Sequence, residues 1–464
     1  MMIARYLTAA SALALAALGN PALAQDKPKS EPWTLQEALG DPEGLEVSGS
    51  IRVRYEALAN QFRPGLDEND DIVSLQTRLF AQYDTGPIRI GGEIIDSRVY
   101  AADAGSSVGT GEVNALELVQ AYIGADFGDA FGEGSEAKLD AGRFTLNLGS
   151  RRLVGRNNFR NTTNAFTGAK FELAGSGGEQ LTLFYTYPQQ RLPSDKDSIL
   201  DNKVKWDREG DELVFWGGFL SKPKITGSTN LEVYFYALEE EDTAIRATRD
   251  RTLYTPGARL FRNPAAGKLD FEFEYAYQFG DINTSSAAAA PKQDVAAQFL
   301  HAELGYQFAG GWQPRIALEY DLATGDEPGG SYGRFDSLYG PRRFDYGPTG
   351  IYGPLGRNNI SSPGVRLEVK PSKRWDGFLF YRAAWLDSAA DSFASTGVRD
   401  ASGASGKFGG HQIEARARYW IIPKALRLDT GAAALFHGRF LETAPNSNGF
   451  GDTLYGYIDV TASF

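Results

Sequence analysis

The sequence contains no cysteine, only 3 histidines and only 2 methionines among its 464 residues. Without cysteine there is no disulfide scaffold, no cysteine nucleophile and no zinc site built on thiolates. Acidic residues outnumber basic ones, and the net charge is −12 at pH 7. A nucleic-acid-binding protein would carry a basic surface instead. We therefore predict no cofactor, no metal site and no nucleic-acid partner.

Long apolar runs are also missing beyond the N-terminus. No later run approaches the roughly 18 residues that a transmembrane helix requires, and the mean hydropathy is −0.34. This pattern excludes a transmembrane helix. It does not exclude a transmembrane β-barrel, because strands that alternate apolar and polar residues average out in hydropathy.

The N-terminus has the features of a secretory signal peptide. Arg5 precedes an apolar stretch over 7–18, and Ala22-Leu23-Ala24 places small residues at the cleavage positions. We predict a signal peptide over 1–24 and a periplasmic segment over 25–46. Within that segment, residues 33–39 are expected to form a helical turn or an ordered coil. The sequence leaves open whether this segment plugs the protein.

From about residue 47 the chain alternates apolar and polar residues with period two. In 269–279, for example, Phe271, Phe273 and Tyr275 share one face, while Glu272 and Glu274 share the other. Such segments, most of them about 10–14 residues long, can cross a bilayer as tilted strands. We predict about 18 strands, which cover 47–58, 72–85, 88–99, 113–127, 137–148, 163–173, 179–187, 211–221, 229–238, 252–263, 268–280, 295–308, 313–324, 361–370, 376–388, 409–420, 425–437 and 452–464.

The connections between these strands alternate between short and long. Tight links such as 85–87 and 264–267 are followed by longer ones such as 281–294 and 325–360. This alternation is typical of an antiparallel up-and-down barrel with short periplasmic turns and long extracellular loops. We therefore predict an all-β transmembrane barrel over 47–464 in the bacterial outer membrane. The last strand, which ends on Phe464, is expected to pair with the first.

The apolar face of each strand is expected to contact lipid, because an arginine facing lipid at mid-depth costs about 2–4 kcal/mol. Charged residues then face the lumen. Once the barrel closes, its first and last strands are neighbours and form a basic wall. The strands between about 229 and 324 form an acidic wall opposite. The basic wall is predicted to contain Arg52, Arg54, Arg78, Arg89, Arg416, Arg418 and Arg427, and the acidic wall Glu232, Glu272, Glu274, Glu303, Glu319 and Asp321. A transverse field across the channel follows.

Several motifs resemble the bacterial alginate export family of outer-membrane proteins. They are Arg52 to Glu56, Gln76 to Leu79 with the turn at 84–86, Gly142 to Gly155 continuing through 158–168, and a block from Thr324 to Asn359. Two positions depart from the pattern. Phe144 stands where a glutamine is expected, and Thr167 stands where an aspartate is expected.

The resemblance implies a monomeric 18-stranded barrel that passes a linear uronate polymer outward through an arginine-lined pore. Arginine suits this task because its planar fork forms two hydrogen bonds with a carboxylate. Loop residues Arg151, Arg156 and Arg160 are expected to fold inward. Expected partners are an anionic polysaccharide or other acidic solute, the outer-membrane lipid and periplasmic export components. The predicted pore-lining residues are Arg52, Arg54, Arg78, Arg89, Arg143, Arg152, Arg366, Arg382, Arg416, Arg418, Arg427, Glu319 and Asp321.

Three other functions share these features in part. A general or uptake porin for small anionic sugars has the same fold, and an inward-folded loop over 325–360 would distinguish a constricted pore from an open one. A structural or adhesion barrel would have a plugged lumen. An enzyme is not expected, since no serine in a glycine-rich turn accompanies His301, His411 or His437. The acidic stretches at 67–71 and 324–327 could hold calcium, but a solvated loop is the simpler interpretation.

Overall fold

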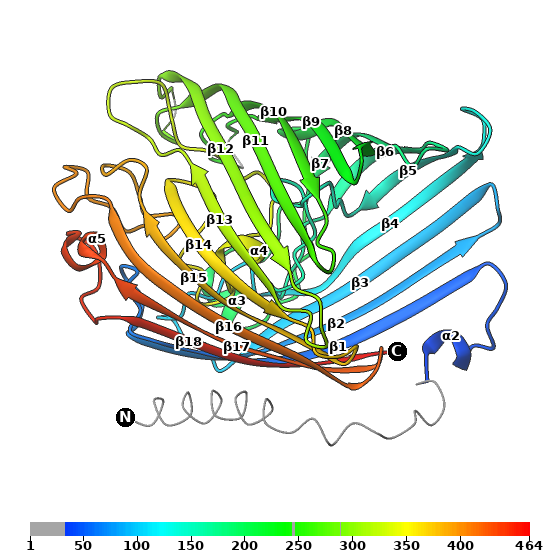
Figure 1. Ribbon diagram of the computed structural model, residues 1–464. Helices are drawn as coiled ribbons and strands as arrows, with labels where there is room; N and C mark the ends of the chain where they lie inside the picture. The colour runs from blue at the N-terminus through cyan, green and yellow to red at the C-terminus, as the bar shows by residue number, and fades with distance from the viewer. Residues whose placement is uncertain (1–32, 244–245, 288) are drawn as a thin grey trace.

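The computed structural model describes residues 33–243, 246–287 and 289–464. The predicted signal peptide, 1–24, lies outside the described residues. The described residues form one closed antiparallel sheet of 18 strands, in which each strand pairs with the next (Figure 1). The strands are β1 (Leu45–Ala59), β2 (Asn69–Asp84), β3 (Ile88–Tyr100), β4 (Asn114–Gly128), β5 (Glu136–Phe144), β6 (Phe166–Ala174), β7 (Gln180–Pro188), β8 (Leu213–Thr226), β9 (Thr229–Glu240), β10 (Thr252–Arg262), β11 (Lys268–Asn283), β12 (Lys292–Gln307), β13 (Arg315–Ala323), β14 (Ile360–Val369), β15 (Trp375–Trp385), β16 (Phe408–Ile422), β17 (Leu426–His437) and β18 (Thr453–Ser463).

The predicted barrel is confirmed, and each predicted segment corresponds to one strand. The two largest differences are at β8, which continues to Thr226 although the pattern predicted an end at residue 221, and at β5, which ends at Phe144 although the pattern predicted a strand to residue 148. The alternation continues through Leu146 and Leu148, but these side chains leave the wall. They are buried in an apolar cluster inside the barrel.

The barrel closes between its first and last strands. β1 pairs with β18 from Ser50 opposite Ser463 to Ala59 opposite Leu454. The Phe464 and Gly49 backbones also exchange hydrogen bonds of 2.8 and 3.0 Å. No strand edge is left unpaired among the described strands, as a bilayer requires.

Four short helices accompany the strands in the described part of the chain. They are α2 (Leu35–Ala38), α3 (Lys196–Leu200), α4 (Arg343–Tyr346) and α5 (Arg439–Thr443). The predicted turn at 33–39 is α2, which lies at the short-turn rim beside the end of the chain (Figure 1). Gln36 fixes it there, since its amide donates to the Leu45 carbonyl and accepts from the Val47 N–H. No helix in residues 33–243, 246–287 or 289–464 has the length and apolarity to span a membrane.

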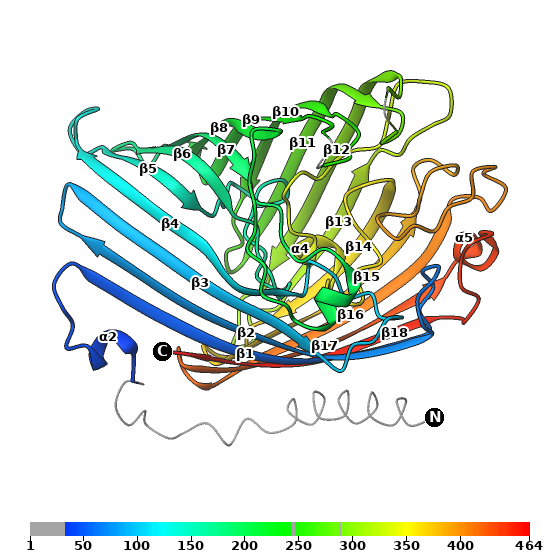
Figure 2. The ribbon, with the colours of Figure 1, turned by 180° about the vertical axis from the view of Figure 1, so that it is seen from behind.

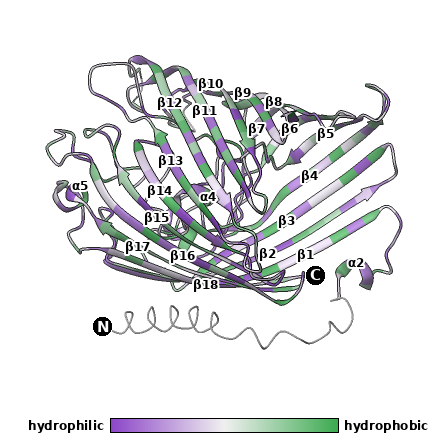
Figure 3. Cartoon of the chain, in the orientation of Figure 1, coloured by the Kyte–Doolittle hydropathy of each residue, from purple (hydrophilic) through white to green (hydrophobic). Residues whose placement is uncertain are grey.

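The two faces of each strand differ as predicted. Val53, Phe273 and Leu318 are exposed on the outer face, with exposed fractions of 45%, 49% and 56%. Their neighbours Arg52 and Glu319 are buried on the inner face. Figure 3 shows the resulting alternation of hydrophobic and hydrophilic residues along the strands. The alternation places apolar side chains against lipid and charged ones in the lumen.

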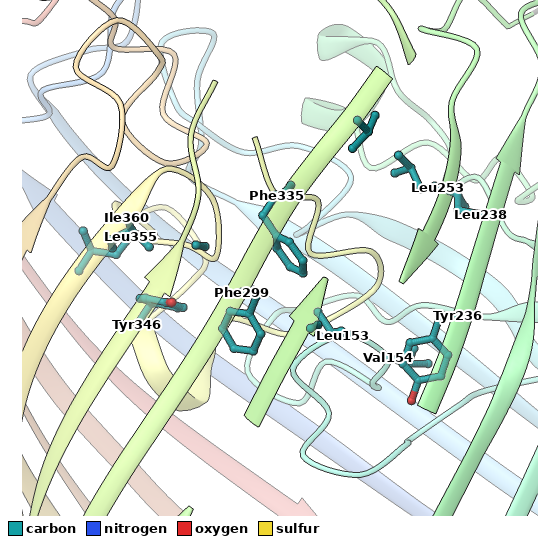
Figure 4. Close-up of a cluster of buried hydrophobic side chains, with 14 of the residues drawn as sticks. Leu153, Val154, Tyr236, Leu238, Leu253, Phe299, Phe335, Tyr346, Leu355 and Ile360 are labelled. Atoms are coloured by element: carbon teal, nitrogen blue, oxygen red, sulfur yellow. The ribbon is translucent and has the colours of Figure 1, made fainter. Parts of the chain in front are cut away.

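Long loops fold into the barrel instead of extending away from it. Both views place α4 inside the ring of strands (Figures 1 and 2). An apolar cluster holds these loops against the wall: Leu153 and Val154 from one loop, and Phe335 and Leu355 from another, pack with strand residues including Phe299 (Figure 4). This burial gives the inward loops a core of their own.

Candidate functional site

Two inward loops divide the lumen. They are the segments 145–165, between β5 and β6, and 324–359, between β13 and β14. Arg152 of the first loop and Asp345 of the second form an ion pair of 3.1 Å. The backbones of Val154 and Tyr339 also pair. The segment 325–360 therefore folds inward, which is the one of the two arrangements left open by the sequence that constricts the lumen.

A basic cavity of about 340 Å³ lies between these loops and the barrel wall; we call it the lumen cavity. Its described lining includes eight arginines and two aspartates. The charged residues are Arg52, Arg54, Arg151, Arg343, Arg366, Arg416, Arg418, Arg427, Asp429 and Asp459. Six of these arginines were predicted to line a pore, and Arg151 was predicted to fold inward. Arg343 was not foreseen, because its position depends on the path of loop 324–359.

Arg52 and Arg54 connect the wall to loop 145–165. Arg52 donates to the carbonyls of Asn158 and Arg160 at 2.8 and 3.1 Å. Arg54 forms an ion pair of 2.8 Å with Asp459 and donates to the Phe159 carbonyl at 2.7 Å. These bonds fix loop 145–165 to the wall. They leave the positive charge of Arg52 only weakly balanced, by Asp459 at 3.7 Å.

Other arginines of the lumen cavity are less constrained. Arg418 pairs with Asp376 at 2.7 Å, and both side chains are about one-third exposed. The guanidinium of Arg427 lies 5.6 Å from the Trp420 ring, and that of Arg151 lies 4.4 Å from the Phe344 ring. Within the described ranges, neither Arg427 nor Arg151 forms an ion pair. Both charges are therefore available to an anionic solute.

Four predicted pore-lining residues instead belong to buried ion pairs beside the cavity. Arg382 is fully buried and pairs with Glu319 at 3.3 Å and with Asp321 at 3.2 Å. Asp321 also contacts His301 at 2.7 Å. Arg152 is held by Asp345, Glu272 and Glu274. Arg152 therefore joins loop 324–359 to the wall, whereas Arg382, Glu319 and Asp321 pair within the wall. All four have little contact with solvent.

Asp345 is central to this network. Burial alone would raise the pKa of its carboxyl, but the guanidiniums of Arg152 and Arg357 hold that pKa well below its ordinary value. The carboxylate therefore stays charged. Arg357, which is fully buried, also donates to the Arg152 and Pro341 carbonyls at 2.8 and 3.0 Å.

The acidic wall exists, but arginines cover much of it. Glu272 lies opposite Glu303, which lies opposite Glu319, so three carboxylates form a row across β11, β12 and β13. Like charges in such a row repel. Arg259 pairs with Glu272 at 2.8 Å, Arg366 pairs with Glu319 at 2.7 Å, and Arg315 pairs with Glu303. The predicted transverse field is weakened at this wall, because arginines from β10, β13 and β14 neutralise the row. The sequence pattern did not show this pairing.

The three remaining candidates lie on the wall away from the lumen cavity. Arg89 pairs with Asp126 and Asp140 at 2.8 and 3.0 Å near the short-turn end of β3. Arg143 pairs with Glu117 at 2.8 Å. Arg78 forms no ion pair in the part of the chain that the structure describes. Its neighbour Arg156, which was predicted to fold inward, donates to Glu93 at 2.7 Å.

Residues 44–450 match the alginate export family, and this match covers most of the chain. The chain belongs to the alginate export family. Its fold is also similar to solved structures of Acinetobacter baumannii OccAB1 (12% identity, TM-score 0.59, covering 91% of this chain and 97% of that chain) and of Pseudomonas aeruginosa OccK8, also called OprE (12% identity, TM-score 0.57, covering 91% and 98%). A third is P. aeruginosa OpdO (14% identity, TM-score 0.56, covering 91% and 97%). No curated protein is significantly similar in sequence.

The alginate export family and the closed barrel together identify an outer-membrane channel rather than an enzyme. The protein is located in the bacterial outer membrane. Among the described residues, no group of three or more histidines, aspartates and glutamates is arranged to hold a metal ion.

Both departures from the family pattern lie beside Arg143. Thr167 is opposite Arg143 in the sheet, and Phe144 is buried in the apolar cluster. Where the pattern has an aspartate at 167, this chain supplies a carboxylate from another loop: Glu209 lies 3.1 Å from Arg143 and accepts from the Thr167 hydroxyl at 3.3 Å. Arg143 is therefore still balanced, and neither Phe144 nor Thr167 lines the lumen cavity.

Proposed function

We propose that this channel passes an alginate-like polyuronate outward through the lumen cavity. The observation that carries the proposal is the excess of guanidinium groups there, eight against two carboxylates among the described lining residues. Each guanidinium can bind a sugar carboxylate through paired hydrogen bonds. A transport path needs many weak contacts rather than one strong one. Arg52, Arg416 and Arg427 differ in how closely a carboxylate of the protein pairs with them, so they would bind a sugar carboxylate with different strengths.

The direction of net transport depends on where the polymer is supplied and not on the structure of the pore. A passive channel conducts both ways, so the net flow depends on which side holds the polymer. A periplasmic polymer pool would make this protein an exporter. Expression in cells that synthesise a polyuronate, followed by measurement of polymer in the medium, tests this direction. Periplasmic accumulation despite a functional pore would contradict it.

A second candidate is a porin for small anionic sugars. The observation favouring it is the limited size of the lumen cavity, about 340 Å³, near the lower end of the range of about 300–1,000 Å³ for small-ligand pockets.

Planar-bilayer recordings distinguish these functions. Under a salt gradient, we expect a reversal potential that reports anion selectivity, and oligo-uronates should interrupt the current while neutral maltohexaose does not. If polymer passes, the blocked time increases with oligomer length and shortens at higher voltage. For a small-solute porin, mono- and disaccharides pass, and longer oligomers block without passing. Cation selectivity, or indifference to uronates, would refute the arginine path.

A further inference from the structure

A second basic cavity lies on the extracellular side of the inward loops. It has a volume of about 640 Å³, and we call it the loop cavity. All of its lining comes from the long loops: for example Arg63 lies between β1 and β2, Arg191 between β7 and β8, and Ser395 between β15 and β16. None of its lining residues belongs to the lumen cavity.

The charge of the loop cavity is unbalanced. Among the described residues, five cations and one carboxylate line it: Arg63, Arg160, Arg191, Lys196, Arg342 and Glu112. Within the same described residues, none of the five cations forms an ion pair.

The hydrogen bonds of these cations orient them without neutralising them. Arg63 donates to the carbonyl of Ile351 at 3.0 Å and also to that of Tyr352. Arg191 donates to the Thr110 carbonyl at 2.9 Å, and Lys196 donates to the Ser106 carbonyl at 2.5 Å. Carbonyl groups carry no net charge, so the positive charge of the cavity remains.

Arg342 and Arg160 are the least satisfied of the five, because neither side chain donates a hydrogen bond to any described residue. Burial and the neighbouring Arg160 and Arg63 guanidiniums lower the pKa of Arg342 to about 9. A Cβ atom on Gly353 would lie 3.0 Å from an Arg342 terminal nitrogen and 3.6 Å from one of Arg63. Two guanidiniums from different loops therefore converge on a point that glycine keeps open.

We propose that the loop cavity is a separate anion-binding site, at which Arg342 and Arg63 bind carboxylate groups of the solute on the extracellular side. The adjacent residues Arg342 and Arg343 line different cavities, so a carboxylate leaving the lumen cavity meets the next guanidinium one residue away in the chain. The identity of the solute rests on the proposed function, whereas the anion site itself does not. Two weak sites in series favour conduction.

Sided block of the chloride current by sulfate tests this proposal. Purified full-length protein is inserted from one chamber of a planar bilayer, and sodium sulfate is added to either side at constant potassium chloride. Sulfate is a small divalent anion, so the test does not depend on passage of any polymer. We expect Arg342→Gln to raise the inhibition constant from the loop side about tenfold and to leave block from the turn side unchanged. Arg342→Lys should retain most of the block.

A matched variant in the other cavity, Arg427→Gln, should weaken block from the turn side and spare block from the loop side. The proposal is overturned if Arg342→Gln changes neither side, or both sides equally. If Arg342→Gln does not change sulfate block while uronates still block the channel, the loop site is refuted and the proposed function is kept. Sulfate block that depends on Arg342 in a channel indifferent to uronates refutes the proposed function and keeps the site.

Discussion

Arg152 donates to both carboxylate oxygens of Asp345, and this contact joins the two loops that divide the lumen. Each residue comes from a different loop, so neither loop can leave the lumen without breaking the pair. This buried ion pair therefore holds the two loops in the lumen together with the apolar cluster.

Asp345→Asn should loosen loop 324–359. The substitution leaves Arg152 and Arg357 without their shared carboxylate, and breaking a buried pair typically costs about 3–5 kcal/mol. We expect a larger and noisier single-channel conductance and faster hydrogen exchange over 324–359. Asp201→Asn is the control, because its pair with Lys203 is exposed. Unchanged exchange and conductance would show that the apolar cluster alone holds the loop.

Arg382→Leu should destabilise the barrel. Arg382 is fully buried between Glu319 and Asp321. Its removal leaves Glu319 paired with Arg366 alone and Asp321 paired with His301 alone. We expect the temperature at which the barrel loses its compact mobility in detergent gels to fall. Adding Asp321→Asn should restore part of the lost stability, since the charge of one carboxylate that faced Arg382 is then removed. Equal stability of the single variant and the wild type would contradict this.

Arg427→Gln should reduce anion selectivity without lowering stability. The guanidinium contacts the Trp420 ring and forms no ion pair with any described residue, so no carboxylate is left exposed by the change. The reversal potential under a salt gradient should move toward the cation side. Lys222→Gln, at an exposed pair outside the lumen cavity, serves as the control. An equal shift of the reversal potential in both variants would show that the lumen cavity does not set the anion selectivity.

The loop between β7 and β8 should loosen as the pH rises to 7. Burial and the neighbouring Glu117 raise the pKa of Asp207 to about 7, above its ordinary value. The folded loop therefore binds the proton more tightly, and its stability falls as the pH rises from about 4 to about 7 and is then constant. The hydrogen-exchange protection factor over 189–212, which is corrected for the intrinsic exchange rate at each pH, should fall across this window. Asp207→Asn should remove the dependence, and its persistence would assign the titration elsewhere.

Strand positions could be predicted from the sequence because a period of two is a local property of each strand. Val53 and Arg52 have their opposite orientations for that reason alone. Loop positions could not be predicted, because they depend on contacts between distant segments. Arg343 and Arg342 lie in a loop with no periodic pattern, and only its packing against Phe299 and its pairing with Arg152 bring them into the lumen. Arg382 has the right orientation for a pore residue, but the inward loop covers it.

The seam between β1 and β18 has a consequence for assembly. The buried ion pair of Arg54 and Asp459 joins residues 405 positions apart in the chain. Closing so long a segment is entropically costly and slow. Until it occurs, both terminal strands have open edges that can pair with other chains. These edges therefore need protection until nearly the whole chain has reached the membrane. The pairing of β1 with β18 is then the last step of barrel closure.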